Sequence, residues 1–142
     1  MRLAEATLDR LKPEVARPGY DRTAQAVGIV HLGIGAFHRA HQAWYTDRAM
    51  DAGDRNWWIC GVSLRSSDVA SQMNPQDGLY TVTERSGKGA DTRLVGAIRG
   101  VLVAPECPGD VVEALCAPAV KIVSLTITEK GYCRAADGSL DP

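Results

Sequence analysis

The chain reads Val30-His31-Leu32-Gly33-Ile34-Gly35-Ala36-Phe37-His38-Arg39-Ala40-His41-Gln42-Ala43 at the point that decides its fold. An apolar run from Gly28 to Leu32 ends in Gly-x-Gly, and a helix-like pattern follows at once. In this order of strand, glycine turn and helix, the backbone approaches a pyrophosphate closely and the helix N-terminus faces the anion. The third glycine of the usual fingerprint is absent, because His38 occupies its place. Gly33 and Gly35 are therefore predicted to contact a nucleotide, and a tight turn without a ligand is the alternative.

Length and composition fit one globular domain. The chain has 142 residues and a formal net charge of −1, without the basic excess that indicates nucleic-acid binding. Its first fifteen residues alternate charged and apolar side chains, and neither a signal peptide nor a membrane span is expected. The four cysteines form no Cys-x-x-Cys pair, which favours reduced thiols in a cytoplasmic protein over a disulfide framework. Cys60 and Cys116 are expected in the core.

Residues 1–27 are interpreted as a polar N-terminal leader, and residues 28–142 as a segment of alternating strands and helices. After the first strand, Gly28–Leu32, a helix is expected from Ala36 to Ala52. The later elements are expected at Trp57–Val62 (strand), Ser67–Met73 (helix), Leu79–Arg85 and Thr92–Val103 (strands joined by a glycine-containing turn), Gly109–Cys116 (helix) and Val120–Ile127 (strand). This order predicts an α/β fold with a largely parallel sheet.

Three basic or titratable side chains follow the glycine turn, namely His38, Arg39 and His41. Positive charge at a helix N-terminus opposes the helix dipole, so a compensating anion is expected. For Arg39, a cofactor phosphate and a carboxylate elsewhere in the fold are equally good candidates for this compensating anion. His38 and His41 lie three residues apart, but no third ligand stands at a recognisable spacing, so no metal site is predicted.

The end of the second strand reads Val62-Ser63-Leu64-Arg65-Ser66-Ser67-Asp68. An acid at the end of this strand usually binds the ribose hydroxyls of NAD, but here Ser63 occupies that position and the carboxylate of Asp68 comes later. Arg65 and its neighbouring serines suit the 2′-phosphate of NADP equally well. Asp68 as the N-cap of the short helix is the structural alternative.

The last strand is followed by Thr126, Thr128, Glu129 and Lys130. In open α/β sheets the carboxyl ends of the strands face the ligand crevice, so these residues are candidates to line a site. A solvated Glu-Lys pair on a loop is the equally weighted alternative.

Three motifs together resemble those of the long-chain mannitol dehydrogenase family, which includes mannitol 2-dehydrogenase, fructuronate reductase and tagaturonate reductase. They lie at Gly33–Ala43, Ile59–Arg65 and Ile122–Tyr132. The resemblance implies a Rossmann-like, largely parallel sheet with flanking helices and a β-hairpin. It further implies an incomplete N-terminal domain, because the family's lysine general base, with a nearby Asn and His, belongs to a mostly helical C-terminal domain that this sequence lacks.

The resemblance implies the nucleotide-binding portion of a metal-independent, NAD-dependent enzyme that interconverts mannitol and fructose, or mannonate and fructuronate. Asp68 then contacts the adenosine ribose, which favours NAD over NADP, and Glu129 lies near the nicotinamide as a candidate active-site residue. The full set of implied cofactor-binding residues is Gly33, Ile34, Gly35, Ala36, Phe37, His38, Arg65, Asp68 and Thr126.

The expected partners are a polyol or keto-sugar acid and the C-terminal domain, with no nucleic acid and no membrane. The chain alone is expected to bind NAD weakly and not to turn over substrate. An NAD-binding sensor without catalysis is the main alternative. A methyltransferase is less favoured, because Ser63 stands where that fold requires an acid.

Overall fold

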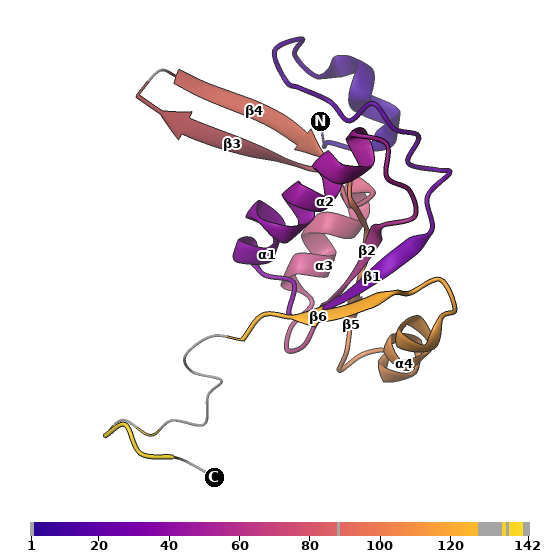
Figure 1. The fold of residues 1–142 in the computed structure, drawn as a ribbon, viewed down its shortest axis with the longest axis vertical. Helices are drawn as coiled ribbons and strands as arrows, with labels where there is room; N and C mark the ends of the chain where they lie inside the picture. The colour runs from indigo at the N-terminus through magenta and orange to yellow at the C-terminus, as the bar shows by residue number, and fades with distance from the viewer. Residues whose placement is uncertain (1, 88, 128–134, 136, 141–142) are drawn as a thin grey trace.

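A computed structural model describes residues 2–87, 89–127, 135 and 137–140 of the chain (Figure 1). Its main sheet is parallel, with the strand order β5-β2-β1-β6. The strands are β1 (Val27–Leu32), β2 (Trp58–Ser63), β5 (Ile98–Val103) and β6 (Ile122–Leu125). Counted in chain order, these strands lie in the order 3-2-1-4, which matches the first four positions of the 3-2-1-4-5-6 order of a doubly wound dinucleotide-binding sheet. The predicted α/β class is confirmed.

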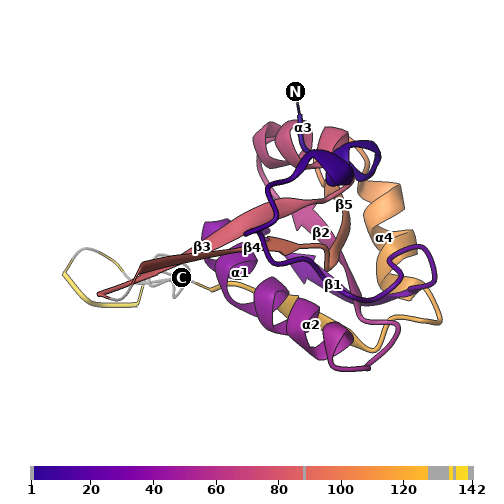
Figure 2. The same ribbon diagram turned by 90° about the horizontal axis from the view of Figure 1, so that it is seen from above.

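Helices cover both faces of this sheet (Figure 2). The helices α1 (Ala36–Ala40), α2 (Gln42–Asp51) and α3 (Asp68–Met73) lie on one face, and α4 (Pro108–Cys116) lies on the other. Successive strand residues point to opposite faces. Ile29 therefore packs in the cluster that contains Met50 and Met73, whereas Val30 packs with Val111 of α4. In the described part of the chain, no helix is long and apolar enough to cross a membrane.

The predicted helix from Ala36 to Ala52 is wrong in one respect, because it is two helices divided at His41. His41 has φ −119° and ψ −83°, outside the helical region. Its backbone N–H is shared between the carbonyls of Phe37 and His38, and its ring Nδ1 lies 2.8 Å from the Phe37 oxygen. The ring and the backbone N–H of His41 thus meet the same carbonyl, at the residue where the chain leaves the helical conformation.

The predicted strand Thr92–Val103 is likewise two strands, β4 (Gly89–Val95) and β5, in different sheets. The division falls at Gly96, whose N–H donates to Asp47 Oδ1 (2.8 Å) and whose carbonyl accepts from Arg22 Nε (2.9 Å) and Trp58 Nε1 (3.2 Å). Side chains thus replace the strand ladder at this residue. The chain leaves the hairpin there and enters the parallel sheet.

A β-hairpin projects from the body of the molecule, as predicted (Figure 1). It consists of β3 (Tyr80–Ser86) and β4, which pair antiparallel from Tyr80↔Val95 to Ser86↔Gly89. Two smaller expectations are wrong, those for Cys116 and for the length of the last strand. Cys116 is exposed, because it is the last residue of α4, whereas Cys60 is partly buried and packs against the core cluster that contains Val30 and Val62. The last strand is shorter than expected, because its partner β1 ends at Leu32 and the paired region ends with it.

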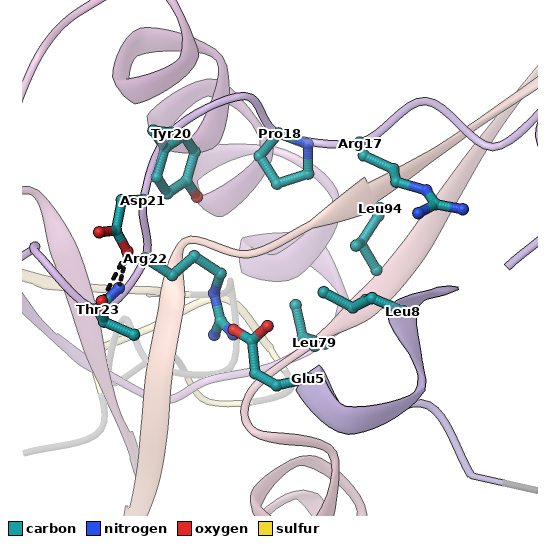
Figure 3. A pocket seen from close by; sticks show the side chains of 10 residues that line it. All are labelled: Glu5, Leu8, Arg17, Pro18, Tyr20, Asp21, Arg22, Thr23, Leu79 and Leu94. Atoms are coloured by element: carbon teal, nitrogen blue, oxygen red, sulfur yellow. Dashed lines mark hydrogen bonds and ion pairs between the residues drawn. The ribbon is translucent and has the colours of Figure 1, made fainter. Parts of the chain in front are cut away.

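The residues that precede β1 pack against the base of the hairpin and enclose a hollow of about 270 Å³ (Figure 3). Arg22 is 8 % exposed and points toward Glu5, with which it forms an ion pair. Its guanidinium also donates to the carbonyl oxygens of Asp77 (2.6 Å) and Ile98 (3.2 Å). Ala16 adds two backbone hydrogen bonds to β4. The leader is therefore tied to both sheets, and β1 begins one residue earlier than expected.

Candidate nucleotide site

The glycine turn lies at the carboxyl end of β1 and is held by its own backbone. Gly33 has φ +90°, a conformation that residues with a Cβ rarely adopt. The N–H groups of Gly33 and Ile34 both donate to the Val62 carbonyl at the end of β2 (2.9 and 3.2 Å), and Gly35 N–H donates to the Gly33 carbonyl (2.8 Å). The turn is therefore fixed between two strand ends.

Ile34 anchors this turn to the sheet. Its side chain is 3 % exposed and lies directly over Gly61 of β2. A Cβ at Gly61 would lie only 2.2 Å from Ile34 Cδ1, so the absence of a side chain there makes room for the turn. Because the Ile34 side chain points into the core, it holds the turn in place and offers no side-chain group to a ligand.

An open hollow of about 350 Å³ lies between the glycine turn and the loop after β2. Its lining residues are Gly33, Ile34, Gly35, Ser63, Leu64, Arg65 and Ser66. The glycine turn and the loop that contains Arg65 thus meet at one surface. Leu64 was not predicted as a site residue, and the serines beside Arg65 were predicted only as partners of a 2′-phosphate.

Asp68 does not line this hollow but opens α3 beside it. The N-cap of α3 is Ser67, and no side chain there caps the helix, so the interpretation of Asp68 as the N-cap is wrong. The Asp68 carboxylate accepts a hydrogen bond from Ser66 Oγ (3.0 Å). Asp68 is thereby connected to the rim of the hollow through Ser66.

The residues after the turn differ widely in exposure. Phe37 is 67 % exposed and stacks on the exposed His41 ring, with 4.3 Å between the ring centroids. Arg39 Nη1 donates to the carbonyl of Ile34 (3.3 Å), so its guanidinium is bonded to the glycine turn. Among the described residues, no three His, Cys, Asp or Glu side chains gather as a metal site.

His38 is buried, with 2 % of its side chain exposed. Neither of its ring nitrogens has a hydrogen-bond partner among the described residues. Its ring stacks on that of His31, with 3.6 Å between the centroids. Burial, followed by the proximity of His31 and Arg39, lowers the pKa of His38 to about 3. His38 is therefore uncharged near neutral pH and does not oppose the dipole of α1. The expectation that His38 adds positive charge at this helix N-terminus is wrong.

This burial predicts that acid destabilises the fold through His38. The unfolded chain binds a proton at His38 below about pH 6.5, whereas the folded chain does so only near pH 3, so stability falls as the pH drops through this window. We expect a loss of about 2 kcal/mol between pH 7 and pH 5. His38→Phe removes this loss in urea unfolding measured at both pH values. The same substitution at exposed His41 is the control, and an equal acid loss in parent and His38→Phe contradicts the prediction.

The other side of the glycine turn carries the end of β6. Thr126 is exposed, and its Oγ1 lies 3.2 Å from His31 Nε2. Thr128, Glu129 and Lys130 lie outside the described residues. His31 was not predicted as a site residue. The only signal in the sequence was a polar side chain within the apolar run of β1.

Comparison with known proteins shows the family. A family model described as the mannitol dehydrogenase Rossmann domain matches residues 27–140. The chain belongs to this family. An uncharacterized oxidoreductase of Escherichia coli, YeiQ, is 48 % identical over 134 residues, which cover 92 % of this chain and 28 % of that protein. The D-mannonate oxidoreductase of E. coli is 42 % identical over 133 residues, covering 89 % of this chain and 27 % of that protein.

Among solved structures, the Pseudomonas fluorescens mannitol 2-dehydrogenase in ternary complex with NAD and D-mannitol is similar over 99 % of this chain, with a TM-score of 0.88 and 40 % identity. The match covers 30 % of that protein. The predicted Rossmann architecture is confirmed. The chain spans less than a third of the length of each of these three relatives.

Proposed function

We propose that this chain is the NAD-binding portion of a polyol or hexuronate dehydrogenase. The observation that carries the proposal is the hollow at which the backbone of Gly33 and Gly35 meets the loop that contains Arg65. A Cβ built on Gly35 would have no neighbour nearer than the Gly33 oxygen at 3.9 Å, so the backbone there is open to an approaching group. This arrangement fits a dinucleotide diphosphate.

The cofactor lies across the carboxyl ends of the strands in this proposal. The N–H groups of Gly33, Ile34 and Gly35 are bonded within the protein, so these residues shape the turn that the diphosphate approaches, and Ala36 follows at the N-terminus of α1. Exposed Phe37 lies beside the diphosphate and His38 lies beneath it. Arg65 and Asp68 lie at the adenosine end, where the Asp68 carboxylate accepts hydrogen bonds from the ribose hydroxyls. We assign Thr126 to the nicotinamide end, and the family resemblance assigns Glu129 there as well.

When bound, NAD would accept the hydride that leaves the carbinol carbon of a polyol or hexonate. The residues of this chain bind and orient the cofactor for that step. The related proteins named for mannitol and for D-mannonate support mannitol with fructose, or mannonate with fructuronate, as the substrate pair. The named relatives are oxidoreductases, which favours an enzyme over an NAD sensor without catalysis. We further propose that the substrate-binding and proton-transfer groups belong to a C-terminal domain, and that the protein works in the cytoplasm.

The proposal is tested by titrating the chain with NADH and NADPH and following the emission of the bound cofactor. We expect saturable NADH binding that is tighter than NADPH binding. Asp68→Ala should weaken NADH binding about tenfold, the loss of one good charge-assisted contact, and should leave NADPH binding nearly unchanged.

Asp110→Ala is the matched control, because Asp110 also stands in the first turn of a helix but on the opposite face of the sheet. It should bind NADH like the parent. Tighter binding of NADPH than NADH, or an unchanged NADH affinity in Asp68→Ala, contradicts the assignment. Turnover of mannitol or mannonate by this chain alone contradicts the placement of the catalytic groups elsewhere.

A further inference from the structure

His31 is the buried side chain on which three segments of the proposed site meet. It stands near the end of β1, is 2 % exposed and faces the side of the sheet covered by α1 and α2. Its ring contacts the end of β6 and the start of α1, and its own strand runs into the glycine turn two residues later. None of the proposed cofactor contacts includes it.

The contacts with β6 are polar and use both ring nitrogens. His31 Nδ1 lies 2.9 Å from Ser124 Oγ, and Nε2 lies 3.2 Å from Thr126 Oγ1. Gln42 Nε2 of α2 donates to the same Ser124 hydroxyl (3.2 Å). A neutral imidazole has one N–H donor and one acceptor nitrogen, so its two hydroxyl partners play opposite roles. The ring thereby fixes the orientation of the exposed Thr126 hydroxyl.

The remaining ring contact lies at the diphosphate side. The His31 ring stacks on His38 of α1, with 3.6 Å between the ring centroids. His31 therefore contacts the helix that follows the glycine turn, and its own strand leads directly into that turn.

An apolar side chain would fill this position in the core without a hydrogen-bonding requirement. An imidazole instead requires two partners, and both come from one short strand end that carries a proposed cofactor contact. Buried polar networks of this kind hold elements in one defined arrangement when every member is satisfied. The contacts of His31 thus join the nicotinamide end of the site to its diphosphate end.

We propose that His31 is a positioning residue for the dinucleotide, which sets the Thr126 hydroxyl in register with the glycine turn. The inference rests on the proposed function. It predicts that His31 matters for a ligand that reaches Thr126 and matters little for one that ends before it. NADH is the first kind of ligand, and ADP-ribose, which lacks the nicotinamide, is the second.

The test compares the dissociation constants of NADH and ADP-ribose by calorimetry. We expect His31→Leu to weaken NADH about tenfold and ADP-ribose less than twofold. His31→Gln carries an amide that reaches the position of Nε2, so it should restore most of the NADH affinity, whereas the shorter His31→Asn should not. Thr126→Val changes an exposed residue and should reproduce the selective loss, even where His31→Leu folds poorly.

Val30→Ala is the control for general weakening of β1, because Val30 lies next to His31 but packs toward α4. It should lower the melting temperature and affect both ligands equally. Equal losses of NADH and ADP-ribose in His31→Leu, or no loss in Thr126→Val, overturn the proposal and leave His31 a residue of the core alone. A parent chain that binds neither ligand overturns the proposed function itself, and the positioning role with it.

Discussion

Asp47→Ala is expected to lower the free energy of unfolding by about 3–5 kcal/mol. The Asp47 carboxylate is fully buried and accepts hydrogen bonds from Tyr20 Oη (2.7 Å), Gly96 N (2.8 Å) and Arg93 Nε (3.2 Å). These donors come from the leader, from the junction between β4 and β5, and from the hairpin. Removal of the carboxylate leaves two buried donors, Tyr20 Oη and Gly96 N, without their partner. It also leaves the largely buried Arg93 guanidinium with Asp51 as its one remaining carboxylate among the described residues.

Urea unfolding followed by circular dichroism measures this loss. Asp54→Ala is the control, because Asp54 is exposed just beyond the end of α2. It should change stability by less than about 0.5 kcal/mol. A loss below about 1 kcal/mol in Asp47→Ala would show that the three contacts do not join the leader and hairpin to the body in the way described.

Gly35→Val is expected to weaken NADH binding at least tenfold while the chain stays folded. Gly35 has φ −94°, which residues with a side chain adopt without strain, and a Cβ there would lie 3.9 Å from its nearest neighbour. The substitution therefore leaves the turn intact. It places branched carbon atoms where the diphosphate must approach the backbone, and such a clash costs more than one good contact.

Gly109→Val provides the matched control, because Gly109 also stands at the start of a helix with no atom within 4 Å of an added Cβ. NADH should bind this variant like the parent. Titration by cofactor fluorescence, with melting temperatures recorded for both variants, separates binding from folding. An unchanged NADH affinity in Gly35→Val contradicts contact between the cofactor and the glycine turn.

Elements with strong local signals were predictable from the sequence. Alternation and apolar runs located the parallel strands, Pro108 marked the start of α4, and the glycine-containing segment predicted the hairpin. The divisions at His41 and Gly96 were not predictable in this way. Gly96 is held by Asp47 and Arg22, which lie 49 and 74 residues away in the sequence, and no local pattern records such contacts.

In the candidate site, too, residues with a local sequence signal were predictable, and residues that depend on distant contacts were not. Gly33 and Gly35 were predicted from the local order of strand, glycines and helix, and Arg65 from its place after a recognisable strand, and the structure brings all three to one hollow. His31 was missed because its partners, Ser124 and Thr126, lie 93 and 95 residues away. The burial of His38 was missed for a related reason, since its stacking partner belongs to the preceding strand.

Nuclear magnetic resonance of the ¹⁵N-labelled chain during an NADH titration tests the central claim most directly. The account predicts saturable shifts in the backbone signals of residues 33–38 and 63–68 and of Thr126, with the tip of the hairpin and the hollow beside Arg22 unchanged. Shifts confined to that second hollow, or no saturable shifts in a chain with a folded spectrum, would contradict a nucleotide site at the glycine turn.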